Sequence, residues 1–103
     1  MLMKKDLSIC RLNDVYGKLL TVNQTEMIRQ FYDDDLSLGE ISENEGITRQ
    51  AAHDAINKGV SALKNYESVL KLVTIFEKLE AIDESMTKEQ ILGLIRNILD
   101  LRD

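Results

Sequence analysis

The chain has 103 residues and a net charge of −5, with 44% hydrophobic residues, 30% charged residues and no proline. This composition is typical of a soluble globular protein and not of a disordered one. The net charge argues against a generic coat for nucleic acid. The length favours a single domain over residues 1–103. Runs of β-branched and aromatic residues with a period of two are missing, so we predict an all-α fold.

Several kinds of chemistry lack the residues they need. Cys10 and His53 are the only cysteine and the only histidine, so we expect no disulfide, no metal site, no cofactor and a buried structural thiol. Paired carboxylates, a nucleophile beside a base, and a phosphate-binding glycine loop are also missing, which argues against an enzyme. With no signal peptide and no apolar stretch of membrane-spanning length, we expect a cytoplasmic protein that avoids membranes.

Two helices are predicted in the first third of the chain. The first runs from about Leu7 to Leu20. Thr21 and Gln24 form a capping box, in which each side chain binds the other residue's amide, and this box opens the second helix. Its apolar face consists of Met27, Ile28, Phe31 and Tyr32. The three aspartates 33–35 would be unfavourable at a helix C-terminus, so we place them in a solvated linker.

A helix-turn-helix pattern follows. Ser37 and Glu40 make a second capping box, and Gly46 supplies the backbone freedom that a helix C-terminus needs. Ile47 is expected to fill the corner, and Thr48 caps a new helix. The inward-facing positions of the two helices are small or apolar: Ile41, Ser42, Ala52, Ala55 and Ile56. Helix, glycine turn and helix in this order are the signature of a helix-turn-helix unit.

The helix that begins at Arg49 shows no clear stop before about Asp83. Apolar residues recur along it at steps of three and four: Leu63, Tyr66, Leu70, Val73, Phe76 and Leu79. Gly59 lies inside this helix, where glycine costs about 1 kcal/mol relative to alanine. Either a close approach by another helix or a kink explains it. Lys64, Lys71 and Lys78 are seven residues apart and would form one basic stripe.

The last helix begins at a third capping box, Thr87 and Gln90, and runs to the end of the chain. More than half of its circumference is apolar: Ile91, Leu92, Leu94, Ile95, Ile98, Leu99 and Leu101. This is too much apolar surface to leave in water, so the helix packs on the long helix, across a homodimer interface, or both. We favour both.

Charge is unevenly distributed along the chain. Residues 48–78 carry five basic and three acidic side chains, whereas the segments on either side are acidic. The side chains that we expect to contact nucleic acid or another partner lie in this segment: Thr48, Arg49, Gln50, His53, Asn57, Lys58, Lys64 and Lys71. Asp54 lies among them and would repel nearby phosphates. With few cations around it, a monomer should bind DNA weakly.

These residues resemble a known family. LSLGEISENEGITRQAAHDAINKGVSALKNYE, preceded by LLTVNQTEMIRQFYDDD, is similar to the YlxM family of small bacterial helix-turn-helix proteins. That family in turn resembles region four of primary sigma factors. The resemblance is densest from Leu19 to Tyr66, and we take residues 21–66 as the core motif. The extension 67–103, with a long helix and an apolar C-terminal helix, agrees in layout.

The resemblance implies a regulatory protein of the signal recognition particle pathway, which would contact the particle's protein or RNA component. Two alternatives stay open: a homodimeric DNA-binding transcription regulator, and an adaptor that docks through its C-terminal helix. The chain departs from the motif just before Gly46, where Asn44 and Glu45 stand in place of an apolar residue. We therefore expect a thin core between the two helices of the motif.

Overall fold

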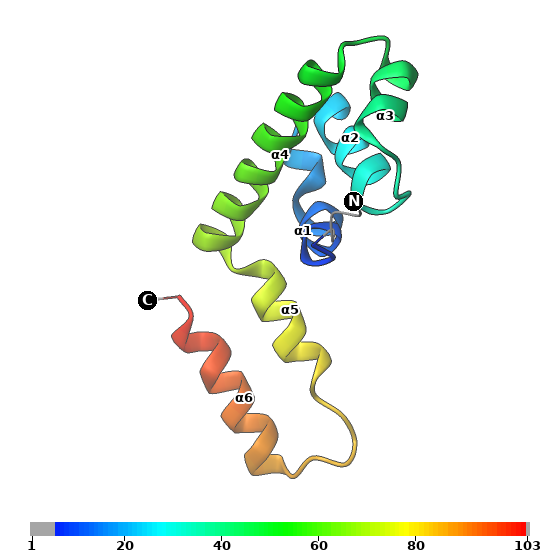
Figure 1. Cartoon of the computed structure of the whole chain (residues 1–103). Coiled ribbons are helices and arrows are strands. Elements are labelled where there is room, and N and C mark those ends of the chain that lie inside the picture. The colour runs from blue at the N-terminus through cyan, green and yellow to red at the C-terminus, as the bar shows by residue number, and fades with distance from the viewer. Residues whose placement is uncertain (1–5, 103) are drawn as a thin grey trace.

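The computed structural model describes residues 6–102, and these contain six α-helices, one 3-10 turn and no strand (Figure 1). In chain order they are α1 (Ser8–Tyr16), η1 (Gly17–Leu19), α2 (Val22–Tyr32), α3 (Leu38–Glu45), α4 (Arg49–Leu70), α5 (Leu72–Glu80) and α6 (Lys88–Asp100). The all-α prediction is confirmed. The first helix is shorter than predicted because the chain tightens into the 3-10 turn after Tyr16. No helix in this part of the chain is long and apolar enough to cross a membrane.

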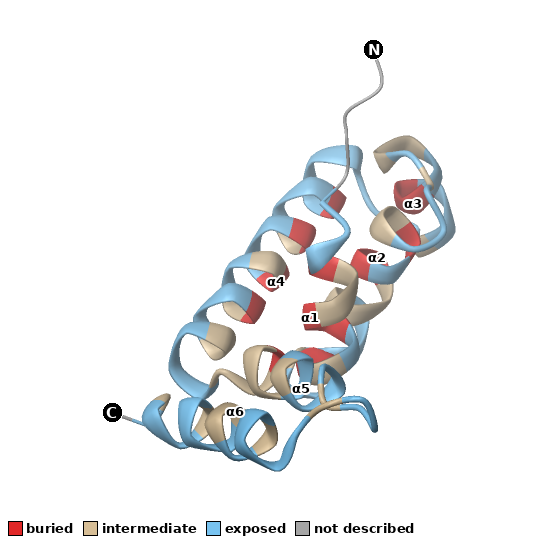
Figure 2. Ribbon diagram, turned by 90° about the horizontal axis from the view of Figure 1, so that it is seen from below, coloured by how far each residue is buried: buried red, intermediate tan, exposed pale blue. Residues whose placement is uncertain are grey.

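The core lies where α1, α2 and α3 pack against α4 (Figure 2). The large side chains that are fully buried there are Tyr16, Ile9, Ile28, Ile41 and Leu63. On α4 the buried residues Ala52, Ile56, Gly59 and Leu63 recur at steps of four and three, so the face that this helix buries follows from its sequence. The four helices form a body that carries the helix-turn-helix unit at one end.

The predicted helix starts are confirmed by their hydrogen bonds. The capping boxes at Thr21, Ser37 and Thr87 are all formed, with both reciprocal bonds present in each. Thr48 caps α4 by accepting from the Ala51 amide at 3.0 Å. Gly46 ends α3 in the left-handed region, with φ at 67°, where a side chain would be strained.

Gly59 marks a close approach of two helices and not a kink. It is buried inside the continuous helix α4. A Cβ added there would lie 2.6 Å from Cδ1 of Ile28 on α2. The missing side chain therefore lets α2 and α4 pack closely at this level.

The prediction of one helix from Arg49 to about Asp83 is wrong, because the helix breaks at Lys71. Lys71 adopts a left-handed conformation with φ at 57°, and α5 starts at the next residue. The amides exposed at the start of α5 are bound by other helices: Leu72 by the Tyr16 hydroxyl, and Val73 and Thr74 by the Glu67 carboxylate. These bonds offset the loss of helix continuity.

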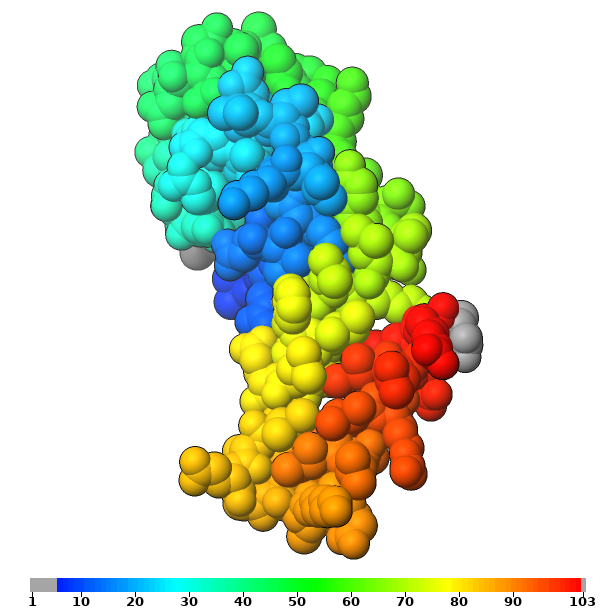
Figure 3. All heavy atoms as spheres, turned by 180° about the vertical axis from the view of Figure 1, so that it is seen from behind, coloured from blue at the N-terminus to red at the C-terminus, as the bar shows by residue number. Residues whose placement is uncertain are grey.

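Beyond the break, α5 and α6 run antiparallel and form an arm that projects from the body (Figures 1 and 3). The arm makes the molecule elongated, at 54 × 27 × 22 Å. The radius of gyration is 17.2 Å, against about 13 Å for a compact chain of this size. Within the described residues α6 packs on α5 and has no buried residue, so its predicted apolar face is largely open.

Candidate nucleic-acid interface

The corner between α3 and α4 sets the direction of the second helix of the motif. The Ile47 amide donates to the Ser42 carbonyl at 3.0 Å, which closes the turn around Gly46. Ile41 and Ala52 are completely buried and pack α3 against α4. The side chain of Ile47 is 38% exposed, so the expectation that it fills the corner is wrong.

Polar contacts replace the apolar residue that the motif lacks before Gly46. Gln30 on α2 is buried, and its amide group donates to the Glu45 carboxylate at 3.1 Å. The Asn44 amide donates to the Gln30 carbonyl oxygen, also at 3.1 Å. These hydrogen bonds hold the last turn of α3 against α2. They take the place of the apolar contact that is missing there, and they give the buried Gln30 side chain its hydrogen-bond partners.

The outer face of the first turns of α4 is exposed to solvent. Its polar side chains are all exposed: Thr48, Arg49, Gln50, His53, Asp54, Asn57 and Lys58. Ala52 and Ile56 on the opposite side are buried in the body, at 0% and 4% exposure. The helix is thus anchored along one face and presents a continuous polar surface on the other, as a helix that enters a nucleic-acid groove must.

Two side-chain pairs organise this surface. The Gln50 amide donates to Asp54 Oδ1 at 2.9 Å, and Asn57 lies 3.4 Å from the His53 ring nitrogens. The Asp54 carboxylate is therefore held along the helix by its neighbour one turn back. The cations nearest to it in sequence, Arg49 and Lys58, make no ion pair among the described residues.

The two lysines predicted further along do not share one surface. Lys64 is exposed on the last third of α4. Lys71 is half-buried at the helix break, where its Nζ donates to the carbonyl of Leu101 at 3.1 Å. Because the helix ends there, Lys64, Lys71 and Lys78 do not form a stripe along a single helix, and that expectation is wrong.

The lone cysteine shows no sign of activation. Cys10 is half-buried on α1, and burial together with the neighbouring Asp33 raises the pKa of its thiol to about 11. The reactive thiolate is therefore scarce at neutral pH. Between residues 6 and 102, no three His, Cys, Asp or Glu side chains gather where they could hold a metal ion.

Helices α1 to α4 pack around one core, and α4, the second helix of the motif, exposes a polar face. These two features define a helix-turn-helix protein. The chain belongs to the UPF0122 family, whose model carries the description "Putative helix-turn-helix protein, YlxM / p13 like" and matches residues 3–99. The predicted family is thereby confirmed.

Similar proteins occur in several bacteria. The UPF0122 protein of Desulforamulus reducens is 42% identical over 93 residues, which cover 90% of this chain and 75% of the relative. That of Fusobacterium nucleatum is 35% identical over 103 residues, which cover 96% of this chain and 100% of the relative. That of Symbiobacterium thermophilum is 36% identical over 104 residues and covers 97% of each.

Proposed function

We propose that this protein is a regulatory protein of the signal recognition particle pathway, and that it contacts the particle's RNA through the exposed face of α4. The association with this pathway rests on the resemblance to the YlxM family. The contact with nucleic acid is supported by the helix-turn-helix scaffold and by the polar surface from Thr48 to Lys58.

The single observation that carries the proposal is the division of α4 into two faces. Ala52 and Ile56 fix the helix in the body, while Arg49 and Lys58 stand free beside hydrogen-bonding groups on the outer face. Free cations are available to phosphate oxygens without the cost of breaking an existing ion pair. The amide and imidazole groups between them are suited to bases and sugars.

Because this face carries few positive charges, a structured RNA is a better ligand for it than duplex DNA. Residues 48–78 carry a small excess of basic side chains on a protein whose net charge is −5. Affinity for duplex DNA is supplied largely by phosphate contacts, and few cations lie near α4. A folded RNA also presents unpaired bases, which need fewer phosphate contacts for recognition.

The second candidate is a homodimeric DNA-binding transcription regulator. It is favoured by the position of Arg49 in the first turn of α4, where a guanidinium reaches guanine O6 and N7 in the major groove. Asp54 weighs against it, because a carboxylate in the same surface repels the phosphates on either side.

One binding experiment separates these functions. The purified chain is titrated with signal recognition particle RNA, with the particle's GTPase and with random genomic duplex, at about 50 and about 200 mM salt. We expect the tightest binding to the RNA, with a shallow dependence on salt because few phosphates are contacted. Tight and salt-steep binding to a discrete duplex site, without a response to the RNA or the GTPase, would overturn the proposal in favour of the second candidate.

A further inference from the structure

The arm formed by α5 and α6 leaves an apolar seam open on each helix. On α6 three exposed apolar residues recur at steps of three and four, Leu92, Ile95 and Leu99, and the exposed Lys88 lies one turn before them. On α5 Phe76 and Leu79 are exposed at a step of three, and Asp83 follows in the loop after the helix. Steps of four and three are those of a helix that packs along its length against another helix.

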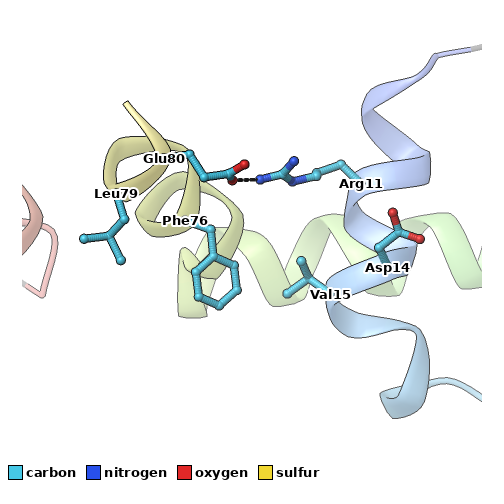
Figure 4. A pocket seen from close by; sticks show the side chains of 6 residues that line it. All are labelled: Arg11, Asp14, Val15, Phe76, Leu79 and Glu80. Atoms are coloured by element: carbon cyan, nitrogen blue, oxygen red, sulfur yellow. Dashed lines mark hydrogen bonds and ion pairs between the residues drawn. The ribbon is translucent and has the colours of Figure 1, made fainter. Parts of the chain in front are cut away.

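Both seams lie on the same side of the arm. Ile75 on α5 shares a cavity with Ile98 and Leu101 on α6, which identifies the sides that face each other. On each helix the seam is rotated about the helix axis by roughly 100° from the side that faces the other helix, in the sense in which the chain winds. Since the two helices are antiparallel, equal rotations in this sense turn both seams to one face. Figure 4 shows Phe76 and Leu79 pointing to the same side of α5.

The apolar face continues onto the body. A groove of about 460 Å³ lies between α1 and α5, and Val15 and Phe76 line it. An ion pair between Arg11 and Glu80 borders this groove (Figure 4). The open face therefore extends from α1 across α5 to the outer edge of α6, with charged groups at its rim.

The size of this face matches what one half of a protein dimer supplies. Its five large side chains are 41% (Phe76), 46% (Leu79), 41% (Leu92), 40% (Ile95) and 50% (Leu99) exposed. At about 200 Å² for a large apolar side chain, they leave roughly 400 Å² of apolar surface in water. An ordinary interface buries about 800 Å² per partner, of which somewhat more than half is apolar.

We propose that a second copy of this chain docks on this face, so that α5 of each copy lies against α6 of its partner. Two helices with open seams are half of a four-helix bundle, and an identical hairpin supplies the other half. Both copies then bury the same surface, as a two-fold axis requires.

The charges at the ends of the seams select this pairing. The α6 seam begins with a cation, Lys88, and the loop after α5 carries an anion, Asp83, at the same tip of the arm. When α6 lies against the partner's α5, Lys88 meets the partner's Asp83. The two-fold axis then runs along the arm, and both helix-turn-helix units lie at the same end of the dimer.

Sedimentation equilibrium without nucleic acid tests the dimer independently of the proposed function. As the concentration is raised to about 200 µM, the wild type should become a dimer. Ile95→Glu should raise the dissociation constant at least about 100-fold, because a glutamate would be buried in the interface. Its circular dichroism should stay unchanged, since Ile95 is exposed in the single chain. Asn97→Glu adds the same charge on the opposite face of α6 and should leave the dimer intact.

A monomeric wild type at the highest concentration overturns the proposal, as does an Ile95→Glu variant that dimerises normally. Lys88→Glu tests the pairing of the helices. The variant places an anion at the start of α6, where the helix dipole favours it, so folding is not at risk. With the partner's Asp83 nearby, the dissociation constant should rise about tenfold, and Asp83→Lys in the same chain should restore it. An unchanged or lower dissociation constant for Lys88→Glu overturns this arrangement.

Discussion

The Tyr16 hydroxyl on α1 donates a hydrogen bond of 2.6 Å to Glu67 Oε1 on α4, just before the long helix breaks. The same hydroxyl accepts from the Leu72 amide at 2.9 Å. Glu67 in turn accepts from the amides of Val73 and Thr74 at 3.0 and 3.1 Å. The first three amides of α5 thus find partners outside their own helix, and this network fixes the direction of the arm relative to the body.

Removing the Tyr16 hydroxyl should destabilise the protein. Tyr16→Phe leaves the Leu72 amide and the Glu67 carboxylate each without one partner, so the free energy of unfolding should fall by about 1–3 kcal/mol. Urea unfolding measures this loss. Tyr66→Phe is the matched control, because the Tyr66 hydroxyl makes no hydrogen bond among residues 6–102. Equal losses in both variants would contradict the role of the network.

The same network predicts a dependence of stability on pH. Burial alone would raise the pKa of Glu67, but hydrogen bonds from Tyr16, Thr74 and the Val73 amide outweigh burial and hold the pKa below its ordinary 4.5. A carboxylate with a lowered pKa contributes stability that is fully present above its unfolded-state pKa. That stability is lost as the pH falls through the folded-state value.

Glu67→Gln isolates this contribution. The variant should be less stable than the wild type at neutral pH, and the difference should shrink as the pH falls below about 4.5. Thermal unfolding at about pH 7 and about pH 3.5 measures the two differences. Glu77→Gln, which is exposed on α5, should follow the wild type at both values. A difference for Glu67→Gln that does not change with pH would count against the carboxylate as the titrating group.

The close approach of α2 and α4 predicts the effect of adding a methyl group at Gly59. Alanine improves helix propensity by about 1 kcal/mol, but its Cβ would lie 2.6 Å from Cδ1 of the fully buried Ile28. Overpacking of this kind costs about 1–3 kcal/mol, so Gly59→Ala should be neutral to destabilising by up to about 2 kcal/mol.

A double-mutant cycle shows whether the clash is the cause. Ile28→Val removes Cδ1, and in that background Gly59→Ala should become stabilising by up to about 1 kcal/mol. Gly93→Ala on α6 is the control for propensity, because an added Cβ there meets nothing within 4 Å. It should stabilise the wild type. If Gly59→Ala has the same effect in both backgrounds, Ile28 is not what excludes a side chain.

The features that sequence reasoning predicted depend on neighbouring residues. Each capping box is formed by two residues three positions apart, and the turn at Gly46 needs only the freedom of one glycine. The break at Lys71 depends instead on residues far apart in the sequence. Tyr16 donates a hydrogen bond to Glu67, which is 51 residues away from it. A lysine in the left-handed region follows no local preference, and the apolar spacing continues across the break, so the pattern of one long helix was misleading.

The candidate contact residues divide in the same way. Six of them follow from helical spacing once the cap is placed, and the structure exposes all six: Thr48, Arg49, Gln50, His53, Asn57 and Lys58. Lys71 was predicted from the same spacing, but the break turns its Nζ to the carbonyl of Leu101. The polar contact between Gln30 and Glu45 could not be anticipated because it joins two helices.

The most direct test of the proposed function measures the affinity of three forms of the full chain for signal recognition particle RNA. These are the wild type, Arg49→Ala, and Arg96→Ala, which removes an exposed arginine on the outer side of the arm. We predict that Arg49→Ala weakens binding about tenfold or more and that Arg96→Ala binds like the wild type. Equal affinity of Arg49→Ala and the wild type for this RNA would contradict the claim that α4 is the contact surface.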